Sequence, residues 1–437
     1  MKAVVFHGVG DIRLDDVEVP KLQDDTDAIV RLTRNAICGT DLHMIRGTLS
    51  GMEPGTILGH EGVGVVEEVG ANVRNLAPGD RVVIPSTIAC GACAQCRAGI
   101  YAQCDVANPN GPQAGTAFFG GPKQSGPFHG LQAELARIPF ANVGLVKLPD
   151  EVSDDQALLL SDIVPTAYFG AELVGIKPGD TVLVLGCGPV GQFAILCSFI
   201  LGAGRVLAVD RVPSRLTLAR EQGAEVIDFD VEDPLEAVRS LTSGAGADRV
   251  IDAVGVDAEP PTRGPAAEQA EEEAERHARQ VEQVAPETNA RGGLWRPGQA
   301  PAQALEWAVQ AVAKAGTISV IGVYPPTLEA FPIGQAMFKN LTLRMGNCNH
   351  RRYIPHLVDM VRAGVFDPSE VLTHEEPLTD AVAAYEAFDQ REEGWIKVEL
   401  FPGQAALELG ASRRAASRRL AEEARAARGP RAPRTPT

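Results

Sequence analysis

The sequence predicts an α/β protein with two domains, an irregular β domain followed by a doubly wound parallel sheet. Three observations predict this fold class. The chain has 437 residues, which exceeds what one hydrophobic core usually supports. Its first 150 residues are rich in glycine and in short β-branched runs. After Pro165, buried runs alternate with helical patterns, and this alternation is typical of a parallel sheet covered on both faces.

The first domain is expected over residues 1–155, completed by a later segment at about 325–402. Turn signals such as Pro78-Gly79-Asp80 separate its β-branched runs, a pattern that favours short strands over alternating helices and strands. The clearest predicted strands are Ala28–Leu32, Val63–Val69 and Arg81–Ile84.

The second domain is expected over residues 156–324. Its predicted strands are Thr181–Leu185, Arg205–Val209, Val226–Phe229, Arg249–Ala253 and Thr317–Val323. Its predicted helices are Val190–Leu201, Ser214–Gln222, Pro234–Thr242 and Ala304–Ala315. The uncharged stretch from Thr181 to Gly204 has the length of a membrane span. Glycine and proline interrupt it where a strand, a turn and a helix would end, so we expect a buried βαβ unit and no membrane contact.

Two segments do not fit a compact core. An insertion over residues 257–301 carries the acidic run Glu268–Glu275, and its composition predicts a solvated helix. The pattern leaves open whether this insertion covers a cofactor, makes subunit contacts or does neither. The basic tail over residues 403–437 has eight arginines after Gly410 and few large apolar side chains, so we expect it to be disordered.

Charge and cysteine usage narrow the class of protein. The formal net charge is −17, which argues against a general nucleic-acid binder because phosphate contacts need a positive face. The N-terminus lacks the charged and apolar regions of a secretory signal, so a reducing cytoplasm is expected.

Four cysteines lie within fifteen residues: Cys90, Cys93, Cys96 and Cys104. This C-x2-C-x2-C-x7-C spacing is typical of a tetrahedral four-thiolate zinc site. A pair of disulfides is disfavoured by the expected reducing compartment, and an iron–sulfur cluster is the remaining alternative. A closed four-thiolate site is structural, so the chemistry must be sought elsewhere.

A dinucleotide motif stands at Gly186-Cys187-Gly188-Pro189-Val190-Gly191, between a predicted strand and a predicted helix. Its glycines permit the tight turn, the approach of a pyrophosphate and close helix–strand packing. Asp210 follows nineteen residues after Gly191, where a carboxylate binds ribose hydroxyls and favours NAD over NADP. Arg211 and Arg215 offer a contrary signal, because either could accommodate a ribose phosphate.

Two further segments carry metal-binding side chains, Cys38-Gly39-Thr40-Asp41-Leu42-His43 and Gly59-His60-Glu61-Gly62. Together with the four-cysteine loop and the dinucleotide motif, in this order, they resemble the zinc-containing medium-chain alcohol dehydrogenase family over about residues 1–402. The resemblance implies a GroES-like catalytic domain, a Rossmann domain, NAD, two zinc ions per chain and a homodimer or homotetramer. It also implies a small alcohol or aldehyde as substrate.

The family resemblance assigns roles to individual residues. Cys38 and His60 match ligands of the catalytic zinc, and Asp41 matches a carboxylate that orients His60. Thr40 and His43 match a proton relay in which the imidazole works near its ordinary pKa. The expected cofactor contacts are Val254, Gly255, Gly322, Val323 and Lys397, the last on a phosphate. The expected pocket residues are Leu42, Met44, Phe118, Phe119, His129 and Met337.

The third zinc ligand departs from the commonest family pattern. Asp162 stands where most members have a cysteine, within Ser161–Tyr168. This carboxylate resembles the glutathione-independent formaldehyde dehydrogenase branch, as does the long insertion. The alternative is that Asp162 caps a helix or turn and that Glu61, otherwise an acidic neighbour of the metal, is the ligand. An arrangement with Glu61 as ligand would favour a polyol or threonine dehydrogenase, and a non-catalytic NAD- and zinc-binding protein is a third reading.

Overall fold

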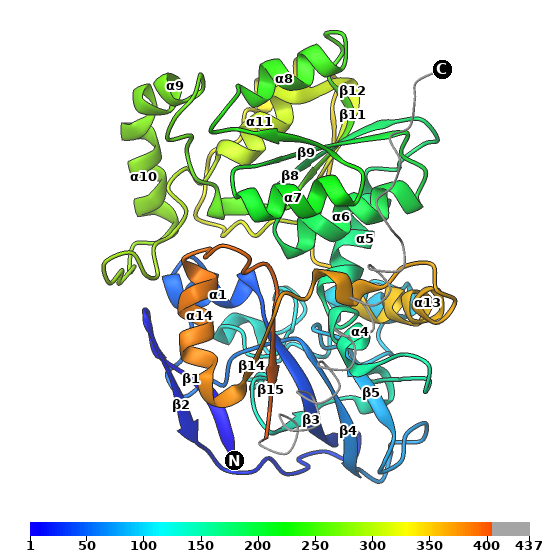
Figure 1. The fold of residues 1–437 in the computed structure, drawn as a ribbon. Coiled ribbons are helices and arrows are strands. Elements are labelled where there is room, and N and C mark those ends of the chain that lie inside the picture. The colour runs from blue at the N-terminus through cyan, green and yellow to red at the C-terminus, as the bar shows by residue number, and fades with distance from the viewer. Residues whose placement is uncertain (404–437) are drawn as a thin grey trace, which may run out of the picture.

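A computed structural model describes residues 1–403, and Figure 1 shows them as two stacked domains. The parallel sheet with its helices forms the upper domain in this view, and the β-rich domain lies below it. All but the first residue of the tail predicted to be disordered lies outside the described residues. Among the residues described, no helix is long and apolar enough to cross a membrane.

The lower domain is GroES-like and holds a mixed seven-stranded sheet. Six strands follow the order β14-β15-β3-β4-β5-β7, and β6 pairs with β3. Their bounds are β3 Ala28–Ile37, β4 Gly62–Val69, β5 Arg81–Ile84, β6 Leu135–Ile138, β7 Val146–Lys147, β14 His374–Pro377 and β15 Val398–Phe401. A separate hairpin joins β1 Lys2–Gly8 and β2 Asp11–Asp16. The three strands predicted here are present, and β3 runs five residues beyond the predicted end at Leu32.

The upper domain holds a six-stranded Rossmann sheet with the order β10-β9-β8-β11-β12-β13. All its neighbouring strands are parallel. Its strands are β8 Thr181–Leu185, β9 Arg205–Asp210, β10 Glu225–Asp228, β11 Ala247–Asp252, β12 Val312–Val320 and β13 Thr342–Met345. The connecting helices are α6 Pro189–Ile200, α7 Pro213–Glu221, α8 Pro234–Leu241 and α11 Gln303–Ala311. The predicted fold class is therefore confirmed.

The predicted boundary between the last helix and its following strand is wrong. Helix α11 ends at Ala311, whereas the prediction extended it to Ala315, and β12 begins five residues before the predicted start at Thr317. The alanine-rich sequence has high helix propensity, but Val312 pairs with Ala247 of the neighbouring strand, and tertiary pairing overrides propensity. Since β13 belongs to the same sheet, the upper domain also continues past the predicted boundary at residue 324.

The remaining helices lie mainly at the domain junction and in the lower domain. They are α1 Gly39–Arg46, α2 Ala94–Arg97, α3 Ala141–Gly144, α4 Asp154–Leu159, α5 Ile163–Leu173, α12 Ile333–Phe338, α13 His350–Arg362 and α14 Ala381–Asp389. One buried cluster joins α4, α5, α6 and α13 and includes Leu158, Val164, Ala194 and Leu357. This packing fixes the start of α5 between the two domains.

The acidic run of the insertion forms the solvated helix that its composition predicts, with no buried residue in α9, but the insertion as a whole is not an excursion away from the core. It forms a 3₁₀ turn η3 Gly255–Asp257 and two helices, α9 Ala267–Glu272 and α10 Ala274–Val284, which lie beside the parallel sheet domain in Figure 1. Its later part packs against the lower domain, where Trp295 is buried in that domain's core. The Trp295 amide donates to Asp389 Oδ2 at 2.8 Å. The sequence did not indicate this apolar anchor, because the acidic run dominates the composition of the insertion.

Candidate active site

Four candidate metal ligands, Cys38, His60, Glu61 and Asp162, meet at the junction of the two domains. One ligand atom from each lies within 4.8 Å of the others, and all four residues are buried. Each stands at the start of an element, because Cys38 precedes α1, the His60-Glu61 pair precedes β4, and Asp162 precedes α5. Short turns between rigid elements therefore hold the donor set.

The His60 imidazole is held from both sides. Its Nε2 lies 3.2 Å from Asp162 Oδ2, and its Nδ1 lies 3.3 Å from Asp41 Oδ1. Asp41 is fixed in turn, because its Oδ2 accepts the Cys38 amide at 3.0 Å. Burial alone would lower the pKa of His60, but the Asp41 and Cys38 charges raise it well above its ordinary value. Asp41 thus occupies the orienting position that a metal-bound histidine requires.

The two carboxylates of the cluster have different partners. Asp162 precedes α5 but makes no capping bond with its side chain, and its Oδ2 lies 3.8 Å from Cys38 Sγ. Glu61 Oε1 accepts a hydrogen bond from the Lys397 ammonium at 2.6 Å, while Glu61 Oε2 is buried and has no hydrogen-bond partner within residues 1–403. Lys397 is fully buried and also donates to the Ile37 carbonyl. The ion pair with Glu61 is a contact that the sequence did not indicate, and because Lys397 also lines the cavity, its contact with a cofactor phosphate stays a prediction.

The four cysteines of the loop gather into a second cluster within 4.8 Å. Cys90 Sγ lies 4.0 Å from Cys96 Sγ, and Cys93 Sγ lies 3.8 Å from Cys104 Sγ. Four sulfurs at about 2.3 Å from a tetrahedral zinc stand about 3.8 Å apart, so the donor set fits the ion. Partial burial opposes ionisation, but backbone N–H donors, first that of Cys96, lower the pKa of Cys93 to about 7.

The glycine motif forms the tight turn between β8 and α6. Gly186 has φ +86°, which favours glycine. A Cβ on Gly191 would lie 1.9 Å from the Gly186 carbonyl oxygen, whereas a Cβ on Gly188 would meet only Arg215 Nη1, at 3.8 Å. The motif therefore packs its helix closely on the strand and leaves open space in front of the helix N-terminus, where a pyrophosphate fits.

Asp210 ends β9 beside this turn, as the motif predicts. Its carboxylate accepts the amides of Cys187 at 2.7 Å, Arg211 at 2.7 Å and Val212 at 2.9 Å. Three backbone donors fix the carboxylate, and of its roughly four acceptor sites the one that remains, on Oδ2, can accept a ribose hydroxyl. Gly255 packs against Gly322 and Val323 just beyond the ends of β11 and β12, at the same edge of the parallel sheet, and a Cβ on Gly255 would lie 2.4 Å from the Val323 carbonyl oxygen.

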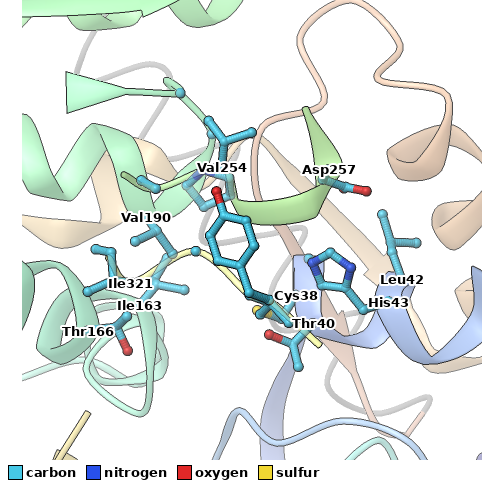
Figure 2. A pocket seen from close by; sticks show the side chains of 18 of the residues that line it. Cys38, Thr40, Leu42, His43, Ile163, Thr166, Val190, Val254, Asp257 and Ile321 are labelled. Atoms are coloured by element: carbon cyan, nitrogen blue, oxygen red, sulfur yellow. The ribbon is translucent and has the colours of Figure 1, made fainter. Parts of the chain in front are cut away.

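A single cavity of about 700 Å³ connects the metal cluster with the dinucleotide turn. Figure 2 shows Cys38, Thr40 and His43 on one side of it and Val190 and Val254 across from them, on the other domain. The predicted cofactor residues that line it are Gly186, Gly188, Pro189, Val190, Asp210, Arg211, Arg215, Val254, Gly322, Val323 and Lys397. The cavity has the size of a small-molecule or cofactor site.

Comparison with known proteins agrees with this geometry. The family model for the alcohol dehydrogenase GroES-like domain matches residues 24–150, and the model for zinc-binding dehydrogenases matches residues 189–260. An uncharacterized zinc-type alcohol dehydrogenase-like protein, AdhB of Bacillus subtilis, is 39% identical over 92% of this chain and 100% of its own length. The chain belongs to the zinc-type medium-chain alcohol dehydrogenase family.

Two further relatives refine the comparison. The solved structure of alcohol dehydrogenase TADH from Thermus sp. ATN1 has a TM-score of 0.75 and 35% identity, covering 92% of this chain and 100% of its own. A glutathione-independent formaldehyde dehydrogenase of Pseudomonas aeruginosa is 37% identical, but the match covers 59% of this chain and 66% of that protein. The likeness to the formaldehyde branch is thus partial.

The cavity of this alcohol dehydrogenase contains only some of the expected pocket residues. Leu42 and Phe118 line it. Met44 and Phe119 are instead buried in hydrophobic cores, and Met337 is exposed on α12. His129 is also elsewhere, because its Nδ1 accepts the Ile57 amide at 3.3 Å. Those four expectations are wrong because the packing of each strand and loop, which decides where a side chain points, was not visible in the sequence.

Thr40 and His43, the predicted relay residues, share helix α1 and line the cavity (Figure 2). His43 is buried, and its Nδ1 lies 2.9 Å from Thr48 Oγ1. Burial lowers the pKa of His43, although the charge of Asp257 opposes this. The expectation of an ordinary pKa is therefore corrected: the imidazole is neutral near pH 7 and can accept a proton.

Two residues close to the site were missed. His350, the first residue of α13, places Nε2 2.6 Å from Asp162 Oδ1. Arg46 is buried and forms ion pairs with Asp257 at 2.6 Å and with Asp389 at 2.7 Å, which join α1 to the insertion and to α14. The sequence carried no signal for either, because each partner is more than 180 residues away.

Proposed function

We propose that this alcohol dehydrogenase uses NAD to oxidise a small alcohol or an aldehyde hydrate. The supporting observation is the single cavity that joins a Cys-His-carboxylate donor set to the dinucleotide turn. When bound, zinc supplies the Lewis acidity that lowers the pKa of a substrate hydroxyl, and NAD accepts a hydride. A panel of primary alcohols, formaldehyde and vicinal diols with NAD tests the proposal, and a two-zinc protein inactive with all of them would contradict it.

The chain's own residues handle the proton and the substrate. Thr40 lies near the metal cluster on the cavity wall, and neutral His43 lies one helical turn further along α1. The hydroxyl of Thr40 can take the substrate proton, and the neutral His43 imidazole can accept a proton at the other end of the relay. The apolar side chains of Leu42 and Phe118 line the same cavity and limit water around the reacting carbon.

Asp162 is proposed as the resting third ligand, with Glu61 beside the metal. The Oδ2 atom of Asp162 faces Cys38 and His60, whereas the charge of Glu61 is matched by Lys397. The unpartnered Oε2 of Glu61 favours the second candidate, a polyol or threonine dehydrogenase with Glu61 as ligand. Oxidation of vicinal diols or threonine, with no turnover of formaldehyde, would support that candidate.

Asp210 should make the enzyme prefer NAD. Replacing it with serine removes the carboxylate that would repel a ribose phosphate, so kcat/KM for NAD should fall about tenfold and that for NADP should rise. Steady-state kinetics with both cofactors measures the change. Arg211 and Arg215 line the same end of the cavity and offer the positive charge that NADP would need. An unchanged preference in Asp210→Ser would contradict this role.

A homodimer is proposed through the outer edge of β13, the last strand of the six-stranded sheet, which pairs with no other strand in the described part of the chain. Large apolar side chains gather here on α12 and β13, and Phe338 is 89% exposed. Exposed apolar patches beside an open strand edge usually mark an interface. Phe338→Glu should halve the mass measured by light scattering, whereas Val231→Glu, at another exposed apolar residue, should not. A monomeric unaltered protein would contradict the proposal.

A further inference from the structure

The two oxygens of the Asp162 carboxylate have different surroundings. Oδ2 faces the metal cluster, with His60 Nε2 at 3.2 Å and Cys38 Sγ at 3.8 Å. Oδ1 faces away and meets three other groups: His350 Nε2 at 2.6 Å, Thr166 Oγ1 at 3.1 Å and Ser86 Oγ at 3.2 Å. One oxygen is therefore free to bind a metal while the other is fully engaged by protein donors.

His350 makes the shortest of these three contacts and is the most buried of the three residues. The residue is 3% exposed, and its Nδ1 lies 3.2 Å from Thr87 Oγ1. The hydroxyl of Thr87 can donate to Nδ1, and with Nδ1 as the acceptor, Nε2 carries an N–H that faces Asp162. A carboxylate without such a donor could rotate and offer both oxygens to the metal.

His350 is itself anchored by the four-cysteine lobe. The residue before it, Asn349, accepts the Ala102 amide on its side-chain Oδ1 at 2.9 Å. Ala102 is buried in the 3₁₀ turn η1 Tyr101–Gln103, which directly precedes Cys104. A chain of contacts thus runs from the four-cysteine cluster through Asn349 and His350 to Asp162.

We propose that His350 is a positioning residue that holds Asp162 with one oxygen toward the catalytic metal, and that the four-cysteine lobe holds His350 in place. The inference rests on the proposed function in one respect, that Asp162 is a ligand of that metal. Metal-bound side chains commonly depend on hydrogen-bonded partners, whose removal costs about 10- to 100-fold in metal affinity. In the common arrangement a carboxylate orients a metal-bound histidine by a hydrogen bond. Here the roles are exchanged, because a histidine orients a carboxylate ligand.

The test compares His350→Leu with His350→Gln in the full chain. We expect His350→Leu to bind catalytic-site zinc about 10- to 100-fold more weakly in competition with a chelator, while the four-cysteine site stays filled. His350→Gln retains an N–H donor and should recover part of that affinity. In protein loaded with Co²⁺ at the catalytic site, His350→Leu should also shift the visible absorption bands, because Asp162 changes its coordination.

The control is His356→Leu, which removes an exposed imidazole from the same helix and should change neither affinity nor spectrum. If His350→Leu does not fold, the same zinc-affinity and Co²⁺ measurements are made on His350→Asn, whose side chain is too short to reach Asp162. Wild-type affinity and spectrum in the variant would overturn the role of His350. Failure of the underlying ligand assignment is distinguishable, because Asp162→Ala would then retain both zinc ions.

Discussion

Replacing Asp162 with alanine should reduce the zinc content from about two ions per chain to about one and nearly abolish turnover. Lewis-acid catalysis by a bound metal contributes several kcal/mol to the rate, so kcat should fall about a thousandfold or more. The lost ion should be the one at Cys38 and His60, because the four cysteines form their own closed cluster. Elemental analysis together with steady-state kinetics measures both effects.

Glu61→Gln is the matched control, since it alters the other carboxylate in the same cluster. The glutamine can still accept the Lys397 ammonium that Glu61 Oε1 accepts at 2.6 Å, and it should retain both ions. The buried ammonium of Lys397 keeps this hydrogen bond but loses the opposite charge of Glu61, so the protein should lose stability. If Glu61→Gln loses a zinc and Asp162→Ala does not, Glu61 is the third ligand.

The parts of the site that the sequence could predict are those built from neighbouring residues. The turn at Gly186–Gly191 and the four cysteines each lie within one short segment, so spacing alone specifies their geometry. A Cβ on Gly191 would lie 1.9 Å from the Gly186 carbonyl oxygen, a constraint set within six residues. The local geometry of such a motif can be predicted because all the atoms that determine it belong to the motif.

The parts that could not be predicted depend on partners distant in the chain. Lys397 reaches Glu61 across 336 residues, and His350 reaches Asp162 across 188. A lysine near a chain end reads as a surface residue, and only the packing of β15 beside β3 brings it to the metal cluster. The solvated acidic helix of the insertion was predicted correctly, but its anchor Trp295 was not, because that side chain packs against the lower domain, which is distant in the sequence.

Replacing Cys104 with alanine should lower stability and weaken the distant catalytic site. Its thiol accepts the amides of Cys90 and Ala107, each at 3.3 Å, and completes the donor set. A four-thiolate zinc site contributes directly to folding, so the variant should lose one zinc and unfold at a temperature several degrees lower. Calorimetry and metal analysis measure these changes.

The effect should extend to Asp162 because Cys104 follows the η1 turn whose Ala102 amide binds Asn349. Once the lobe loosens, His350 loses its support, and the catalytic zinc of the still-folded protein should pass to a chelator faster than in the unaltered chain. Cys197→Ala removes a buried thiol from α6, outside both clusters, and should leave that exchange rate unchanged. An equally slow exchange in Cys104→Ala would show that the lobe stabilises the domain without positioning the catalytic ligand.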